Sequence, residues 1–254
     1  MQKSRRKFLM KLGLSGLTAI SFPSLLSAIN NSDHSLKNTN DKGLTILFQG
    51  DSITHGNRTL DNDWNHVMGH GYAYLIASRL WYDYPEKDLM FYNRGVSGDK
   101  VSDLVKRWDK DTINLKPDVL SILIGVNDVS KIVANEYSIE DWNENYKKLL
   151  DRTKKELPNT ILILCEPFLL PEDWEIKKTD SRQIVIQKMQ KFVRQQAKDY
   201  NAIFVELQEP FNRACNKAPA KYWIWDTVHP MPAGHELIAR LWIKEFSKNI
   251  DLNF

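Results

Sequence analysis

Four short segments of the 254-residue chain hold the residue types that acyl transfer requires. This chemistry needs a nucleophile, a base, a group that orients the base, and donors for the oxyanion. Residues 50–52 (Gly-Asp-Ser) offer a hydroxyl, and residues 226–229 (Asp-Thr-Val-His) offer a carboxylate and an imidazole. Residues 95–99 (Gly-Val-Ser-Gly-Asp) and 125–128 (Gly-Val-Asn-Asp) offer glycine amides and an asparagine side chain. The set therefore predicts a nucleophilic hydrolase.

Each of these residues also has a structural interpretation when it is taken singly. Ser52 and Asp226 could cap helices, because both residue types are favoured at helix N-termini. Gly98 and Asn127 are typical turn residues. A single histidine such as His229 is more often structural than catalytic. The catalytic prediction therefore depends on the four segments occurring together.

Apolar runs and helical spacing predict the elements that would position these segments. The expected strands are 44–48, 89–92, 118–124, 160–165 and 202–207, and the expected helices are 72–80, 101–108, 139–150, 184–197 and 234–246. Continuous apolar strands separated by helices indicate a parallel sheet covered on both faces, hence a three-layer α/β/α domain over residues 43–254. Ligands bind beyond the carboxyl ends of such strands, so we expect the four segments at one edge.

Gly50 lies at the end of the first expected strand. A glycine at this point permits a sharp turn. We expect the turn to place Ser52 at the opening of the next segment, with its backbone N–H free to face a ligand.

In order and in content, the four segments resemble blocks I, II, III and V of the SGNH (GDSL-like) hydrolase superfamily, from about Leu44 to the last helix. The resemblance implies a flavodoxin-like fold with a five-stranded parallel sheet, and a serine esterase without a cofactor. It implies Ser52 as nucleophile, His229 as base and Asp226 as the carboxylate that orients the imidazole. The oxyanion hole would consist of the N–H of Ser52, the N–H of Gly98 and the side-chain NH₂ of Asn127.

Further polar residues near these segments receive structural predictions. We expect Asp51 and Asp128 to brace loops by hydrogen bonding, because one carboxylate already suffices for the base. The other histidines show no strong metal-ligand spacing, so no metal is expected. These histidines are His55, His66 and His70, which follow the predicted nucleophile, and His235, which lies in the last expected helix.

Aromatic residues flank the predicted catalytic segments and suggest a carbohydrate substrate. They are Trp64, Tyr222, Trp223 and Trp225. Aromatic faces suit stacking on sugar rings, although rim and core positions use the same residues. The first choice, which is an expectation from the family resemblance and from the export signal described below, is deacetylation of a plant or algal polysaccharide or its oligosaccharides, so the expected partner is a small-molecule or polysaccharide ester. Two alternatives stay open: a short-acyl or lysophospholipid-type lipid esterase, and a non-catalytic glycan-binding module on the same fold.

The N-terminus is typical of an export signal. Residues 1–28 carry five basic and no acidic residues, with a short apolar stretch from Leu12 to Leu26. The pair Arg5-Arg6 before Phe8-Leu9 favours a twin-arginine signal over a Sec signal, and residues 29–42 are expected to be a flexible leader. We therefore predict a periplasmic or secreted protein without a stable membrane anchor. Beyond residue 28, 30 basic residues face 32 acidic ones, which gives no indication of nucleic-acid binding.

The two cysteines, Cys165 and Cys215, fit no metal-binding spacing. Cys165 lies in an apolar run and is expected to be a small buried residue. A disulfide between the two is possible in an oxidising compartment, and the sequence alone leaves the pairing open.

Overall fold

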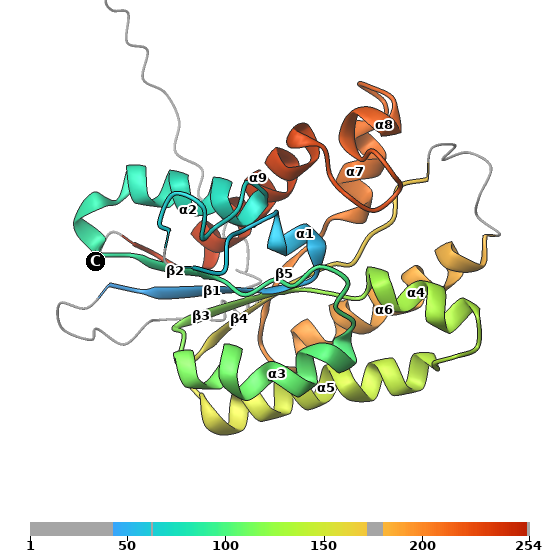
Figure 1. Ribbon diagram of the computed structural model, residues 1–254, viewed down its shortest axis with the longest axis horizontal. Helices are drawn as coiled ribbons and strands as arrows, with labels where there is room; N and C mark the ends of the chain where they lie inside the picture. Colours follow the sequence, from blue (N-terminus) through green and yellow to red (C-terminus); the bar gives the residue numbers. More distant parts are fainter. Residues whose placement is uncertain (1–42, 62, 172–179, 253–254) are drawn as a thin grey trace, which may run out of the picture. The chain divides into compact units, whose positions relative to one another are not determined.

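A computed structural model describes residues 43–61, 63–171 and 180–252. This part of the chain contains a parallel five-stranded sheet (Figure 1). The strands lie in the order β2-β1-β3-β4-β5, and every neighbouring pair is parallel. Their bounds are β1 Thr45–Gly50, β2 Met90–Asn93, β3 Val119–Leu123, β4 Ile161–Cys165 and β5 Ile203–Val205. The predicted fold class is thereby confirmed.

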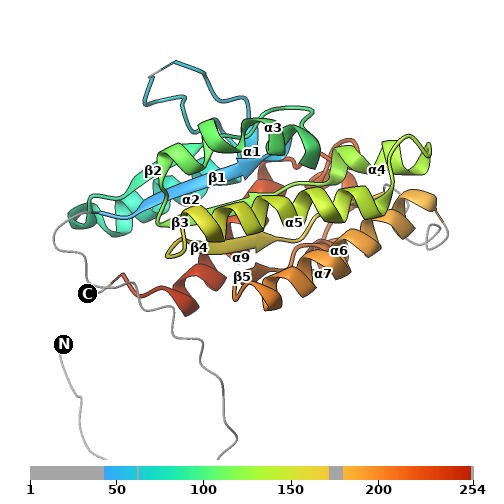
Figure 2. The same ribbon diagram turned by 90° about the horizontal axis from the view of Figure 1, so that it is seen from below.

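Helices cover both faces of this sheet (Figures 1 and 2). On one face lie α2 (Tyr72–Asp83) and α9 (Pro232–Asn249), which contact each other. On the other lie α3 (Val101–Asp111), α5 (Ile139–Glu156) and α6 (Ser181–Asp199), with α5 packed against both neighbours. Shorter elements are α1 Ser52–His55, α4 Val126–Val133, α7 Gln208–Ala214, α8 Ala220–Trp223, and two 3₁₀ turns at Pro85–Lys87 and Ile113–Leu115.

Each face of the sheet has its own aromatic core. On the α2/α9 face, Trp242 packs against Phe48 and stacks on Phe246. On the opposite face, Trp142 packs against Tyr146 and Phe192. Apolar burial of this kind is the main favourable contribution to folding, and it fixes the strand ends on which the site depends.

The structure departs from the sequence prediction mainly in helix length and in short helices. The long helices extend beyond their predicted ends, because polar and charged residues continue the exposed face after the apolar stripe ends. The expected strand 202–207 narrows to three residues, since Leu207 already begins the turn into α7. The sequence did not predict α7 and α8, which are too short for a periodic apolar stripe, nor α4, whose N-cap Gly125 and first-turn Asn127 are residue types favoured in turns.

The predicted export signal and leader, residues 1–42, lie outside the described residues. Within the described part of the chain, none of the helices has the length and apolar character that a membrane span needs. Cys165 is buried, as expected, and both it and Cys215 are free thiols.

Candidate active site

Ser52 is the first residue of α1, directly after β1. The preceding Gly50 allows the chain to turn here, because a Cβ at this position would lie 2.3 Å from the carbonyl oxygen of Leu123. Asp51 caps α1, and its Oδ1 accepts the N–H of Ile53 at 3.0 Å. The Ser52 N–H donates to no acceptor among the described residues, as expected for the first amide of a helix.

His229 and Asp226 lie in a tight loop between α8 and α9. The loop is closed by an antiparallel bridge between Ile224 and Pro230. Asp226 Oδ1 accepts the backbone N–H of His229 at 2.7 Å and that of Val228 at 3.1 Å. These two bonds and the imidazole contact hold the pKa of Asp226 below its usual value, although burial acts in the opposite direction.

Between these two residues, Thr227 adopts a φ of 76°. This left-handed conformation is unfavourable for a β-branched residue and occurs chiefly where the surroundings enforce it. Here the Thr227 carbonyl accepts the N–H of Leu170 at 3.0 Å, which ties the loop to the segment after β4.

The tertiary structure brings the loop to the serine. Ser52 Oγ lies 2.8 Å from His229 Nε2, and His229 Nδ1 lies 2.6 Å from Asp226 Oδ2. With its proton on Nδ1, the imidazole donates to the carboxylate and accepts the serine O–H through Nε2. This arrangement can remove a proton from Ser52 and return it to a leaving group.

The two remaining predicted oxyanion donors face the same edge of the sheet. Gly98 is exposed with a φ of 85°, and its N–H also has no acceptor among the described residues. Asn127 lies in the first turn of α4, where its Nδ2 donates one hydrogen to the carbonyl of Asp99 at 3.0 Å. The amide group carries two hydrogens, so this bond orients Asn127 while leaving one donor for a ligand.

Two buried carboxylates stand beside these groups. The Asp128 side chain accepts the N–H of Val101 at 3.3 Å, so it braces α4 against the start of α3 as expected. Burial raises the pKa of Asp128 to about 8 and that of Asp51 to about 7. The hydrogen bonds of the two side chains go to the backbone N–H groups of Ile53 and Val101 and not to Ser52 or His229, so both bracing predictions agree with the geometry.

The other histidines play no part in the serine–imidazole chain. His235 Nδ1 accepts the N–H of Tyr72 at 3.1 Å, and burial lowers the pKa of His235 to about 4. His66 pairs with Asp63 on the surface. Across the residues that the structure describes, no group of three or more His, Cys, Asp or Glu side chains is placed to hold a metal ion.

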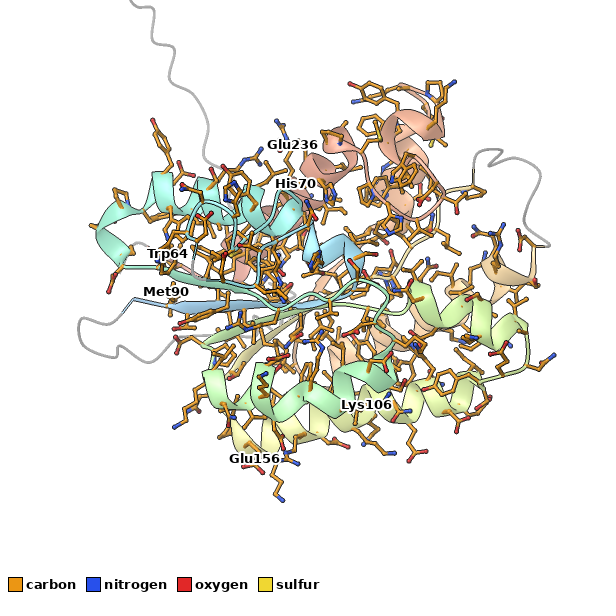
Figure 3. All side chains as sticks on the ribbon, in the orientation of Figure 1. Trp64, His70, Met90, Lys106, Glu156 and Glu236 are labelled. Atoms are coloured by element: carbon orange, nitrogen blue, oxygen red, sulfur yellow. The ribbon has the colours of Figure 1, made fainter. Side chains whose placement is uncertain are left out.

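The four predicted aromatic residues occupy unlike positions. Trp225 is 61% exposed, and its ring centroid lies 6.1 Å from that of His229. Tyr222 is also exposed and packs edge-on against Trp223, whose indole donates to the carbonyl of Ala218. Trp64 is exposed on the loop between α1 and α2 (Figure 3). Only Trp225 is therefore in ring contact with the residues that the sequence assigned to catalysis.

Two residues that the sequence did not single out join the site to its surroundings. Asp99 supplies the carbonyl that orients Asn127, and Arg107 on α3 donates to the Asp99 carboxylate at 2.7 Å. Arg107 lies in a helix whose solvent-facing residues are also charged, so the sequence offers no signal that separates it from a surface arginine.

Fold and site define a carboxylic ester hydrolase of the α/β/α type. Residues 48–237 match the GDSL-like lipase/acylhydrolase family, and the chain belongs to that family. An acetylxylan esterase from Geobacillus stearothermophilus is 31% identical over 211 residues, which cover 80% of this chain and 94% of the relative.

The chain is also similar in fold to solved structures of such enzymes. The crystal structure of the G. stearothermophilus acetylxylan esterase matches with a TM-score of 0.72, 30% identity, and coverage of 80% of this chain and 94% of that one. A protein described as a GDSL-like lipase, from Parabacteroides merdae, matches with a TM-score of 0.76 and 37% identity over 82% of this chain and 97% of its own. An α/β hydrolase enzyme from the metagenome of Lake Arreo has a TM-score of 0.73 at 26% identity, over 83% and 98% of the two chains.

Proposed function

We propose that this chain is an exported serine esterase that removes O-acetyl groups from carbohydrate. The observation that carries the proposal is the hydrogen-bonded chain from Ser52 Oγ through His229 to Asp226, at 2.8 and 2.6 Å. A serine in this arrangement is an activated nucleophile, because the neighbouring imidazole accepts its proton as the hydroxyl attacks.

The proposed reaction proceeds in two halves. In the first, Ser52 Oγ attacks the ester carbonyl carbon, its proton passes to His229 Nε2, and the leaving sugar hydroxyl takes that proton as the C–O bond breaks. In the second, water attacks the acetyl-serine, His229 removes one water proton, and Ser52 recovers that proton as the product leaves as acetic acid, which then ionises in solvent. Asp226 keeps the Nδ1 proton in place and stabilises the imidazolium in both halves.

The negative charge that develops on the carbonyl oxygen needs hydrogen-bond donors of its own. We assign this role to the N–H of Ser52, the N–H of Gly98 and the free hydrogen of Asn127 Nδ2. Both backbone amides lack acceptors among the described residues, so they are available to a ligand. Donors fixed in advance are effective because they need no reorganisation as charge develops.

A carbohydrate leaving group is supported by the acetylxylan esterase relative and by the exposed aromatic rings. Trp225 stands beside His229 and offers a flat apolar face where a sugar ring would stack. Tyr222 and Trp64 are assigned to more distant sugar contacts. Export to the periplasm or medium, proposed from residues 1–28, would bring the enzyme to polysaccharide fragments.

The first test is hydrolysis of p-nitrophenyl acetate by the chain without residues 1–28, beside a Ser52→Ala variant. We expect the variant to lose at least about 10³-fold in kcat. Equal rates would remove Ser52 as nucleophile and favour a glycan-binding module on the same fold.

The second test identifies the ester. Release of acetate from acetylated xylo-oligosaccharides is compared with hydrolysis of p-nitrophenyl esters of two to twelve carbons. We expect kcat/KM to fall as the acyl chain lengthens and acetylated sugars to compete with the acetyl ester. A maximum at medium or long chains would contradict the carbohydrate assignment and support a lipid esterase.

A further inference from the structure

Arg107 contacts two segments beside the predicted oxyanion hole, the end of β1 and the loop after β2. Its side chain is only 17% exposed, and it projects from α3 toward the carboxyl ends of β1 and β2. Nε donates to Asp99 Oδ2 at 2.7 Å, and Nη1 donates to Gln49 Oε1 at 2.9 Å. Nη2 donates to the carbonyl of Gly50 at 3.3 Å.

These contacts lead to each of the three proposed oxyanion donors. Gly50 is two residues before Ser52, so the guanidinium fixes the turn that sets the Ser52 amide. Asp99 directly follows Gly98, so the ion pair fixes the loop that sets the Gly98 amide. The carbonyl of Asp99 in turn receives the hydrogen bond that orients Asn127.

The charge of Arg107 is balanced locally. Asp111 Oδ2 lies 3.1 Å from Nη1, and Asp99 holds the other end of the guanidinium. Gln49, fully buried, donates to the Asp111 carbonyl and to Thr112 Oγ1, which fixes the acceptor that Arg107 uses. Two carboxylates against one guanidinium leave little net field for the oxyanion, so the contribution of Arg107 is to position the donors.

We infer that Arg107 is a positioning residue for the oxyanion hole, which it holds together by joining the end of β1 to the loop after β2. The inference rests on the proposed function, since it needs the oxyanion donors to be those assigned above. Arginine suits the task because its planar group has donors in fixed directions, whereas a lysine ammonium is a single point charge. A displacement of catalytic groups by about 1 Å can cost about 10²-fold in rate.

The test is steady-state hydrolysis of p-nitrophenyl acetate by Arg107→Gln and Arg107→Lys variants. We expect kcat to fall about 10²-fold in Arg107→Gln and by less in Arg107→Lys, with KM little changed. The matched control is Arg152→Gln, which removes the ion pair between α5 and Asp109 of α3 but touches no site residue. It should keep the wild-type kcat even if it unfolds at lower temperature.

A double-mutant cycle separates positioning from general stability. If Arg107 acts through Asn127 and its neighbours, Arg107→Gln should slow an Asn127→Ala variant by a clearly smaller factor than it slows wild type. Guanidinium ion at millimolar concentration should also restore part of the activity of Arg107→Ala. Equal factors in the cycle together with no rescue would overturn the inference, as would a wild-type kcat in Arg107→Gln.

Asp99→Asn keeps the test decisive if the Arg107 variants do not fold. It retains the carbonyl that orients Asn127 and weakens only the ion pair, so we expect a smaller loss in kcat; an unchanged kcat would count against the inference. Ser52→Ala is measured in parallel. If Ser52→Ala stays active, the proposed function fails. If Ser52→Ala is inactive while the Arg107 and Asp99 variants keep the wild-type kcat, only the inference about Arg107 fails.

Discussion

The chain contains two Asp-x-x-His pairs with nearly the same carboxylate–imidazole distance and different surroundings. Asp63 Oδ2 lies 2.5 Å from His66 Nδ1, and Asp226 Oδ2 lies 2.6 Å from His229 Nδ1. In each pair the histidine contact helps to lower the pKa of the aspartate. The His66 side chain is 65% exposed, whereas that of His229 is 39% exposed and its Nε2 reaches Ser52 Oγ.

The difference shows what a local motif provides and what it leaves open. A three-residue spacing lets a carboxylate and an imidazole meet without help from the rest of the fold, and it does so twice here. The serine lies 177 residues from His229, so the second contact depends on tertiary packing, in which Trp242 of α9 packs against Phe48 of β1. The partner on Nε2 therefore separates a surface ion pair from a candidate catalytic base.

Replacement of each aspartate by asparagine tests the difference between the two pairs directly. We expect Asp226→Asn to lower kcat by about 10³–10⁴-fold, because the imidazole loses its orienting acceptor and the stabilisation of its positive charge. Asp63→Asn, the matched control, should leave kcat for p-nitrophenyl acetate unchanged. Similar losses in both variants would mean that the loop at 63–66 takes part in the reaction.

Removal of the proposed oxyanion donor Asn127 tests a contact that no local motif provides. We expect Asn127→Ala to lower kcat by about 10²–10³-fold with KM little affected, because the amide acts on charge that develops in the transition state. Asn145→Ala on α5 also removes hydrogen bonds, to Tyr137 and to the backbone, and serves as control. A rise in KM at constant kcat would instead assign Asn127 to ground-state binding.

The smallest effect on activity is expected from substitution of Asp128. The side chain of Asp128 is buried, whereas that of Asp226 is part-exposed. The pKa of Asp128 is raised to about 8 when folded, so as pH rises from about 4 the unfolded chain ionises first. The contribution of Asp128 to the free energy of unfolding should therefore fall between about pH 4 and pH 8. Protonated Asp128 stabilises the folded chain, relative to ionised Asp128, most strongly near pH 4.

Asp128→Asn should reduce this slope while its side-chain oxygen still accepts the N–H of Val101. Burial also raises the pKa of Asp51 to about 7 and lowers that of His235 to about 4, and these two contributions to the slope have opposite signs between about pH 4 and pH 6.5. Denaturant unfolding at several pH values measures the slope, with Asp109→Asn, an exposed partner of Arg152, as control. A slope equal to wild type would show that Asp128 is ionised in the folded protein.

Much of the fold could be predicted from residue patterns. The apolar runs gave the five strands because fully buried parallel strands need continuous apolar residues. The short helices α7 and α8 escaped prediction, since elements of seven and four residues show no periodic stripe and form through tertiary contacts. The start of α4 gives no helix signal, because Gly125 and Asn127 are residue types favoured in turns.

By itself the sequence determined the chemical groups and their strand ends. Ser52 after β1, Gly98 after β2, Asn127 after β3 and the pair Asp226 and His229 before α9 all follow from local pattern, as does the local hydrogen bond inside that pair. Only the tertiary structure decided that His229 reaches Ser52, that Asp99 orients Asn127, and that Arg107 joins both loops. The physical reason is that these contacts join distant segments, whose approach is set by the packing of the whole core around the sheet.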